Sequence, residues 1–202
     1  TITGKGTHAA MPHTGIDPVV IGAEIVTALQ TIVSRNTDPL ESAVVSVTMF
    51  HGGDAKNIIP NSVSLSGGVR TLDQATRKLI EQRMGQIVAG ICDAHGATYS
   101  FDYQPGYPAT VNAEEETAFA AAAARDVTSD ADVLTDIKPV MGSEDFAYML
   151  QEKPGSYIFI GNGDGDGASS CMVHNPGYDF NDGILTLGAR YWSRLVEMQL
   201  PK

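Results

Sequence analysis

The chain has 202 residues, of which 43% are hydrophobic and 18% are charged, a balance typical of a folded globular protein. Lys and Arg number 13 against 24 Asp and Glu, and the net charge of −11 disfavours nucleic acid and anionic membrane surfaces as partners. No uninterrupted apolar run approaches the roughly 18 residues of a membrane span, and the 2 cysteines are too few for a disulfide framework, so we expect no membrane partner and a cytoplasmic location.

The first half of the sequence, residues 1 to about 110, follows a β-α-β-β-α-β order. The pattern predicts a strand at Ile2–Ala10 and then a helix that Asp17 caps and Pro18 begins. Apolar residues recur at helical spacing along this helix, namely Val19, Ala23, Val26, Leu29 and Val33. Because the chain begins with Thr1 rather than Met and opens on a strand, we expect it to be a piece of a longer polypeptide.

Two strands, a second helix and a last strand complete this half. Ala43–Phe50 is rich in Val, Thr and Ser, and a strand at Ser62–Thr71 follows it after a glycine pair. Side chains of the latter strand alternate between two faces, with Val63, Leu65 and Val69 on one and Ser62, Ser64, Ser66 and Arg70 on the other. A helix begins at Asp73, and the last strand spans Ala97–Tyr103. A four-stranded antiparallel sheet with both helices on one face, the ferredoxin-like arrangement, satisfies this order.

The second half, residues 111–202, begins after two prolines, Pro105 and Pro108, that mark a boundary. In chain order we predict a helix, two short strands and a closing amphipathic helix, at Glu114–Val127, Asp136–Met141, Ser156–Gly161 and Ile184–Gln199. This is too little material for a doubly wound α/β domain. We therefore expect this half to be part of a domain whose remainder lies elsewhere.

One histidine, His174, lies in an irregular Asn-Pro-Gly loop just before the closing helix. An imidazole suits zinc or a similar divalent ion, and a neighbouring carboxylate could fix its tautomer. Metal sites usually show clustered ligands, however, and His174 has none at ligand spacing nearby. On the residues alone, a loop histidine that is hydrogen-bonded to Asp179 or Asp182 is the more economical interpretation.

Three residues in the first half are also candidates for chemistry. His8 is flanked by glycines and small residues that leave its ring exposed, although an ordinary surface histidine fits the same pattern. Arg70 can clamp a carboxylate through its forked guanidinium, or simply pair with a surface Asp. Asn57 can donate to a carbonyl, or close the turn between two strands.

Two further stretches allow plain structural interpretations. Gly142-Ser143 precedes two acidic residues, and Ser143 as the N-cap of a helix explains this pattern without any ligand. Part of a calcium loop is matched by Asn162, Asp164, Asp166 and Gly167. Position 12 of that loop is Val173 instead of Glu, so we expect no calcium site.

Five stretches occur in a consistent order across nearly the whole chain: GKGTHAAMPH, GGDAKNIIPNSVSLSGGVRT, MGSEDFAYML, PGSYIFIGNG and VHNPGYDFND. Together they resemble the M20 metallopeptidase family, and within it the aminoacylase and hippurate-hydrolase-like amidohydrolases. The resemblance implies an α/β (α+β) enzyme in which residues 1–110 form a ferredoxin-like lid and dimerisation domain. Residues 111–202 would then be the end of the metal-bearing catalytic domain.

The same resemblance assigns roles to the candidate residues. It implies that His174 is a metal ligand and that His8 reaches the active site of the partner subunit in a homodimer, where it faces the developing oxyanion. Asn57 and Arg70 match residues that hold the substrate, Arg70 through the substrate carboxylate. A substrate-side loop of the family is matched by Gly142 and Ser143.

The family's other metal ligands and its general-base Glu belong to an N-terminal segment that this chain does not contain. The complete site is expected to hold two divalent ions (Zn, Mn, Co or Ni), with a metal-bound water attacking the amide of an N-acyl amino acid or small peptide conjugate. The chain alone is expected to bind metal weakly and to be inactive. A non-catalytic dimerisation or ligand-binding module is the alternative.

Overall fold

The computed structural model describes residues 1–163, 165 and 171–200. The chain divides into two compact units, Thr1–Ala109 and Thr110–Lys202. Asp164, Asp166 and Gly167, which the calcium-loop comparison uses, lie outside the described residues.

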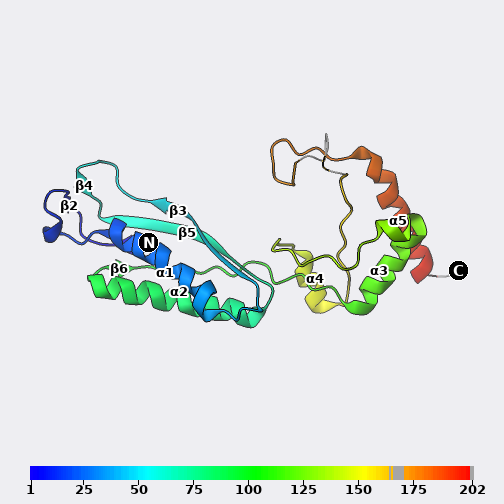
Figure 1. Cartoon of the computed structure of the whole chain (residues 1–202), viewed down its shortest axis with the longest axis horizontal. Coiled ribbons are helices and arrows are strands. Elements are labelled where there is room, and N and C mark those ends of the chain that lie inside the picture. The colour runs from blue at the N-terminus through cyan, green and yellow to red at the C-terminus, as the bar shows by residue number, and fades with distance from the viewer. Residues whose placement is uncertain (164, 166–170, 201–202) are drawn as a thin grey trace. The chain divides into compact units, whose positions relative to one another are not determined.

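The first unit contains a four-stranded sheet with the strand order β3-β5-β1-β6, in which every neighbouring pair is antiparallel. A separate two-stranded sheet joins β2 to β4. The strands are β1 (Ile2–Thr3), β2 (Thr7–His8), β3 (Ala43–His51), β4 (Ile58–Ile59), β5 (Ser62–Thr71) and β6 (Thr98–Tyr99). The helices are η1 (Pro12–Thr14), α1 (Pro18–Thr31), η2 (Ile32–Asn36) and α2 (Gln74–His95). Both long helices contact the sheet and each other (Figure 1).

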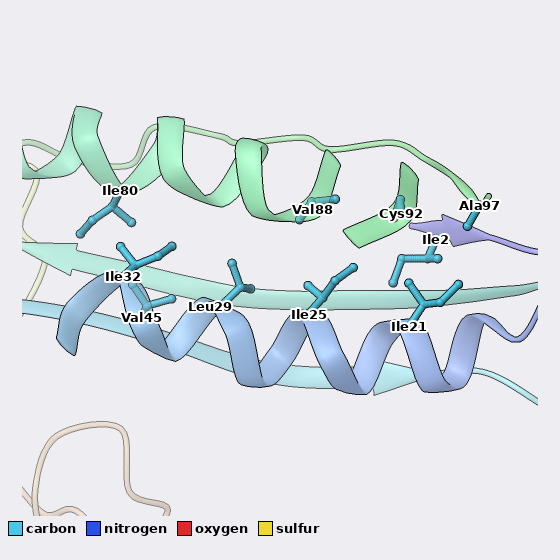
Figure 2. Close-up of a cluster of buried hydrophobic side chains, with 10 residues drawn as sticks. All are labelled: Ile2, Ile21, Ile25, Leu29, Ile32, Val45, Ile80, Val88, Cys92 and Ala97. Carbon is cyan, nitrogen blue, oxygen red and sulfur yellow. The ribbon is translucent and has the colours of Figure 1, made fainter. Parts of the chain in front are cut away.

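The core of this unit lies between α1, α2 and the sheet. Figure 2 shows the buried side chains of the two helices pointing toward one another. The predicted helix is confirmed, but its buried stripe with η2 is Ile21, Ile25, Leu29 and Ile32. Of the apolar series that indicated the helix, Leu29 is buried and Val26 half-buried. Both stripes are apolar and helically spaced, but burying three isoleucines removes more apolar area from water than burying Val and Ala. The stripe with the larger side chains therefore faces the core.

Local signals of the first unit are confirmed where a short stretch decides them. Asp17 caps α1 by accepting hydrogen bonds from the amides of Val19 and Val20, at 2.8 and 3.5 Å. In β5, Val63 is buried, Leu65 and Val69 are half-buried, and the predicted outer residues are exposed. The alternation of apolar and polar residues in β5 therefore predicts correctly which of its faces is buried.

The predicted strand Ile2–Ala10 is in fact two short strands in different sheets. Between them, Lys5 pairs with Ile16 through two backbone hydrogen bonds of 2.9 and 3.0 Å. A Cβ at Gly4 would lie 2.2 Å from the carbonyl oxygen of Ile16, so only glycine allows this approach. The close crossing at Gly4 ends β1, and the chain then turns away to form β2.

The helical stretch Pro18–Asn36 is 19 residues long with a mean hydropathy of 1.2, which by length and composition is enough to cross a membrane. The expectation that no apolar stretch approaches this length is therefore wrong. That expectation counted uninterrupted apolar residues, whereas a mean over the helix tolerates Glu24 and the scattered hydroxyl side chains. Within this unit, one face of the stretch packs in the core.

The second unit consists of helices and extended segments. The helices are α3 (Glu114–Val127), η3 (Asp130–Asp132), α4 (Phe146–Glu152), η5 (Asp182–Ile184) and α5 (Leu185–Gln199). Helix α3 packs against α5, where Arg194 forms a 2.7 Å ion pair with Asp126.

The two predicted strands of the second unit, Asp136–Met141 and Ser156–Gly161, are absent from its described residues. A strand requires a ladder to a neighbouring backbone, and at Tyr157 the side chain of Asn112 takes the place of such a neighbour. Its amide accepts from the Tyr157 N–H and donates to the Tyr157 carbonyl, both at 2.8 Å. Val140 and Phe159 are 62% and 67% exposed. Ser156, Tyr157 and Ile158 are half-buried, so the segment Ser156–Gly161 is buried only in part.

Candidate functional site

His8 and Asn57 lie side by side because β2 pairs with β4. His8 is opposite Ile58 in the register, and the amide of Ala9 donates to the carbonyl of Asn57 at 3.0 Å. Figure 1 places β2 and β4 together at one end of the first unit. Two of the predicted site residues, 49 positions apart in the sequence, are thus brought together by a long-range pairing.

The ring of His8 is oriented by a hydrogen bond from its own loop. The amide of Ala10 donates to Nδ1 of His8 at 3.0 Å, so Nδ1 is an acceptor. The neutral ring must then carry its proton on Nε2. The side chain is exposed, and its Nε2–H is directed away from that backbone contact. With Nδ1 accepting from Ala10, the hydrogen-bond donor that His8 can offer to an oxygen atom of a ligand is its Nε2–H.

Arg70 lies far from His8 within the same unit. It sits near the end of β5, opposite Val44, while β4 precedes the start of β5. Eight residues separate Ser62 from Arg70, and a rise of about 3.3 Å per residue puts these positions roughly 26 Å apart. Among the described residues no ion pair involves Arg70, so the surface Asp partner is not found. Its guanidinium makes one long contact, 3.5 Å to its neighbour's carbonyl.

The Gly142-Ser143 segment of the second unit leads into α4, but Ser143 does not cap it. The helix begins at Phe146, and the nearest side-chain acceptor is Glu144, whose Oε1 lies 3.4 Å from the amide of Phe146. Tyr157 holds this carboxylate by donating its hydroxyl to Oε2 at 2.8 Å. The prediction of Ser143 as N-cap is wrong because the longer, anchored Glu144 side chain reaches the helix start. Gly142 and Ser143 stay exposed.

The acidic pair beside this segment titrates unequally. The hydrogen bond from Tyr157 lowers the pKa of Glu144, and the same bond raises the pKa of the Tyr157 hydroxyl. The neighbouring Glu144 carboxyl raises the pKa of Asp145. The contact between Glu144 and Tyr157 could not be predicted from the sequence, because it joins residues 13 positions apart and the chain must fold back to make it.

His174 occupies a backbone position that side-chain-bearing residues rarely adopt. Its φ is 69°, and a hydrogen bond of 3.1 Å from the amide of Asn175 to the carbonyl of Met172 closes the turn around it. Positive φ at this place is typical of a type II turn, where glycine is usual. His174 is exposed, and within the described part of the loop it forms no hydrogen bond to Asp179 or Asp182. The hydrogen bond expected from the sequence is therefore not found in the described part of the loop.

Comparison with known proteins places the chain in a family. The sequence profile described as Peptidase family M20/M25/M40 matches residues 5–198. The chain belongs to this peptidase family. Hippurate hydrolase of Campylobacter jejuni is 35% identical over 195 residues, which cover 96% of this chain and 50% of that protein. The N-acyl-L-amino acid amidohydrolase of Geobacillus stearothermophilus is 51% identical over 114 residues, covering 56% of this chain and 31% of that protein.

Solved structures agree with this assignment. A dinuclear metal binding peptidase of the M20 family from Bacillus subtilis is 25% identical with a TM-score of 0.73, over 98% of this chain and 48% of that one. An aminohydrolase candidate from methicillin resistant Staphylococcus aureus is 33% identical with a TM-score of 0.81, over 100% of this chain and 51% of that one. The M20 chain described above is thus a mixed α/β protein that spans about half the length of its relatives.

The described residues of this M20 chain do not make up a metal centre by themselves. Within residues 1–163, 165 and 171–200, no group of three or more His, Cys, Asp or Glu side chains could hold an ion. His174 offers one unengaged imidazole, whereas tetrahedral zinc requires four ligands, of which proteins supply three or four. The dinuclear centre of the M20 peptidase named above therefore has no complete counterpart in the described residues.

The isolated 202-residue chain is expected to bind zinc weakly and without fixed stoichiometry, because one imidazole cannot fill the coordination sphere. Isothermal titration with zinc, repeated on a His174→Gly variant, measures this directly. Glycine fits the positive φ of the turn, so the variant removes the imidazole without straining the loop. One equivalent of zinc held at micromolar affinity or better would contradict the expectation.

Proposed function

We propose that this chain is the C-terminal portion of an M20 amidohydrolase that cleaves the amide bond of N-acyl amino acids or small peptide conjugates. The observation that carries the proposal is the donor geometry of His8, in a chain with several relatives that are named for the hydrolysis of N-acyl amino acids. Those relatives include a hippurate hydrolase, an N-acyl-L-amino acid amidohydrolase and an N-acetyl-L-cysteine deacetylase. Each name describes removal of an acyl group from an amino acid.

The residues of this chain bind and orient in the proposed reaction. His8 donates its Nε2–H to the oxygen that gains charge as the amide carbonyl is attacked, since a fixed donor stabilises that charge more than the ground state. Asn57, beside it, contacts the same end of the substrate. Arg70 binds the amino-acid carboxylate through its guanidinium fork. Gly142 and Ser143 line the substrate from the catalytic side.

His174 is proposed as one ligand of a divalent metal pair whose other ligands lie outside this chain. When bound, such ions supply an activated water and polarise the carbonyl. A strained, exposed imidazole fits a ligand role, because unusual backbone conformations cluster at functional sites. Within the described residues His174 belongs to no group of three or more His, Cys, Asp or Glu side chains that could hold an ion, so the proposed ion requires ligands from elsewhere.

The first unit is proposed to be a ferredoxin-like lid that forms a homodimer. Its strand order and its two helices on the sheet support this. Strand β3, with nine residues, lies at the edge of the sheet and leaves one row of backbone groups unpaired. A twofold axis would pair β3 with its copy in antiparallel fashion.

Such a pairing reverses one sheet relative to the other. His51 of β3 lies at the end of the unit near His8, and Ala43 lies at the end near Arg70. Antiparallel pairing puts the His51 end of one copy beside the Ala43 end of the other. The His8 end of one subunit then adjoins the Arg70 end of its partner, which accounts for two substrate-binding groups being so far apart within one chain.

The proposal is tested with this chain extended to the length of its relatives. The extended protein is expected to hold a divalent metal and to release amino acids from N-acyl amino acids such as hippurate. Its proposed location is the cytoplasm. Metal analysis and an amine-release assay measure the two properties, with His174→Gly as the matched inactive control. An extended protein without divalent metal that leaves N-acyl amino acids uncut would instead support a non-catalytic dimerisation or ligand-binding module.

A further inference from the structure

The segment that carries His8 is held by very few hydrogen bonds of its own strands. The β2–β4 sheet comprises only two residue pairs, Thr7 with Ile59 and His8 with Ile58. A two-stranded ladder of this size is marginal in water. Contacts outside the ladder must therefore keep His8 in place.

Asn61 supplies two of those contacts, on either side of Lys5. Its backbone carbonyl accepts from the amide of Gly4 at 2.9 Å, and its side-chain Oδ1 accepts from the amide of Gly6 at 2.9 Å. Asn61 therefore anchors the segment on both sides of Lys5 with one residue.

The fit of Asn61 to Gly6 is tight. A Cβ at Gly6 would lie 2.9 Å from Oδ1 of Asn61 and 2.8 Å from the carbonyl oxygen of Ile59. On its other edge the segment is closed by Lys5 pairing with Ile16 and by a 2.6 Å hydrogen bond between the hydroxyls of Thr7 and Thr14. The strand leading to His8 is thus clamped from two sides, and Asn61 is the side-chain acceptor on the β4 side.

We propose that Asn61 is a positioning residue for His8. Its Oδ1 binds the amide of Gly6, two residues before His8, and so fixes the start of the loop. In this loop conformation the amide of Ala10 donates to Nδ1 of His8, and the Nε2–H is left for the ligand. This rests on the proposed donor role of His8 and extends it to a residue that carries no reactive group. Loss of the Gly6 contact frees the segment, and the ring then samples both tautomers.

The test uses the 202-residue chain labelled with ¹⁵N and needs no turnover. The ¹⁵N signals of His8 tell which ring nitrogen carries the proton, and amide exchange reports Gly6 and Ala10. Asn61→Leu keeps the side-chain shape but lacks the acceptor, and we expect about tenfold faster exchange at both amides, as for one hydrogen bond lost, with mixed tautomers. Asn61→Asp retains the acceptor and should keep the wild-type signals, as should Ser62→Ala, a neighbouring exposed side chain.

The positioning role would be overturned if Asn61→Leu kept the wild-type His8 tautomer and the wild-type exchange rate of the Ala10 amide. It would also be overturned if Ser62→Ala changed the tautomer and the exchange rates as much as Asn61→Leu does. Asn61→Ala, which also lacks the acceptor, is measured in the same way if the Leu variant does not fold. The wild-type spectrum separates the two proposals. A proton on Nδ1 in wild type removes the donor role of His8 itself, whereas a proton on Nε2 that survives Asn61→Leu removes only the role of Asn61.

Discussion

Replacing His8 with Ala in the extended protein is expected to lower turnover about a hundred- to a thousandfold, the usual cost of one oxyanion donor. The expectation follows from the hydrogen bond between the Ala10 amide and Nδ1, which fixes the proton on Nε2. A donor that acts on developing charge contributes mainly in the transition state, so kcat should fall far more than KM rises. Steady-state kinetics with an N-acyl amino acid measures both.

His13→Ala is the matched control, since His13 is an exposed histidine of the adjacent helix η1 and has no assigned role. It should retain wild-type turnover. Metal content and dimerisation should be unchanged in both variants, because His8 lies in the first unit and His174 in the second. Metal lost on replacing His8 would show that His8 is a ligand and not a donor.

The parts of the fold that the sequence predicted are those decided within a few residues. Asp17 and Asp73 each cap a helix through amides two and three positions later, and both are visible as caps in the sequence. The alternation of β5 is likewise local, since each side chain reports its own face. Such signals need no knowledge of distant segments.

Long-range contacts account for what was missed. The pairing of His8 with a second strand could not be predicted from the sequence, because β2 and β4 are about fifty residues apart along the chain. The predicted strand Ser156–Gly161 failed for the complementary reason. Its β-rich composition is present, but the backbone N–H and carbonyl of Tyr157 pair with the side-chain amide of Asn112 instead of a neighbouring strand. Composition predicts the ability to form a strand, and a neighbouring backbone decides whether one forms.

The candidate site shows the same division. His8, Asn57 and Arg70 were all selected from the sequence, yet their spacing could not show that the first two adjoin and the third lies at the far end of the sheet. If His8 and Arg70 both bind the substrate as proposed, the separation of Arg70 is informative, because one subunit cannot place both ends of its sheet around one small substrate. A twofold dimer removes this difficulty.

Mixing two inactive variants of the extended protein is expected to restore activity. A His8→Ala subunit keeps His174, and a His174→Gly subunit keeps His8. If His8 acts across the dimer, the mixed dimer has one site with both residues intact and one site with neither. Random exchange of subunits makes half of the dimers mixed, so turnover should recover to about a quarter of wild type under twofold symmetry.

The recovery distinguishes the two possible placements of His8. If His8 served the site of its own subunit, every site in the mixed dimer would lack one residue and turnover would stay at the level of the separate variants. Subunits mixed under mild denaturation and refolded, with each variant refolded alone as the control, provide the measurement. A recovery to about a quarter requires the His8 end of one sheet to meet the site of its partner, as antiparallel pairing along β3 does.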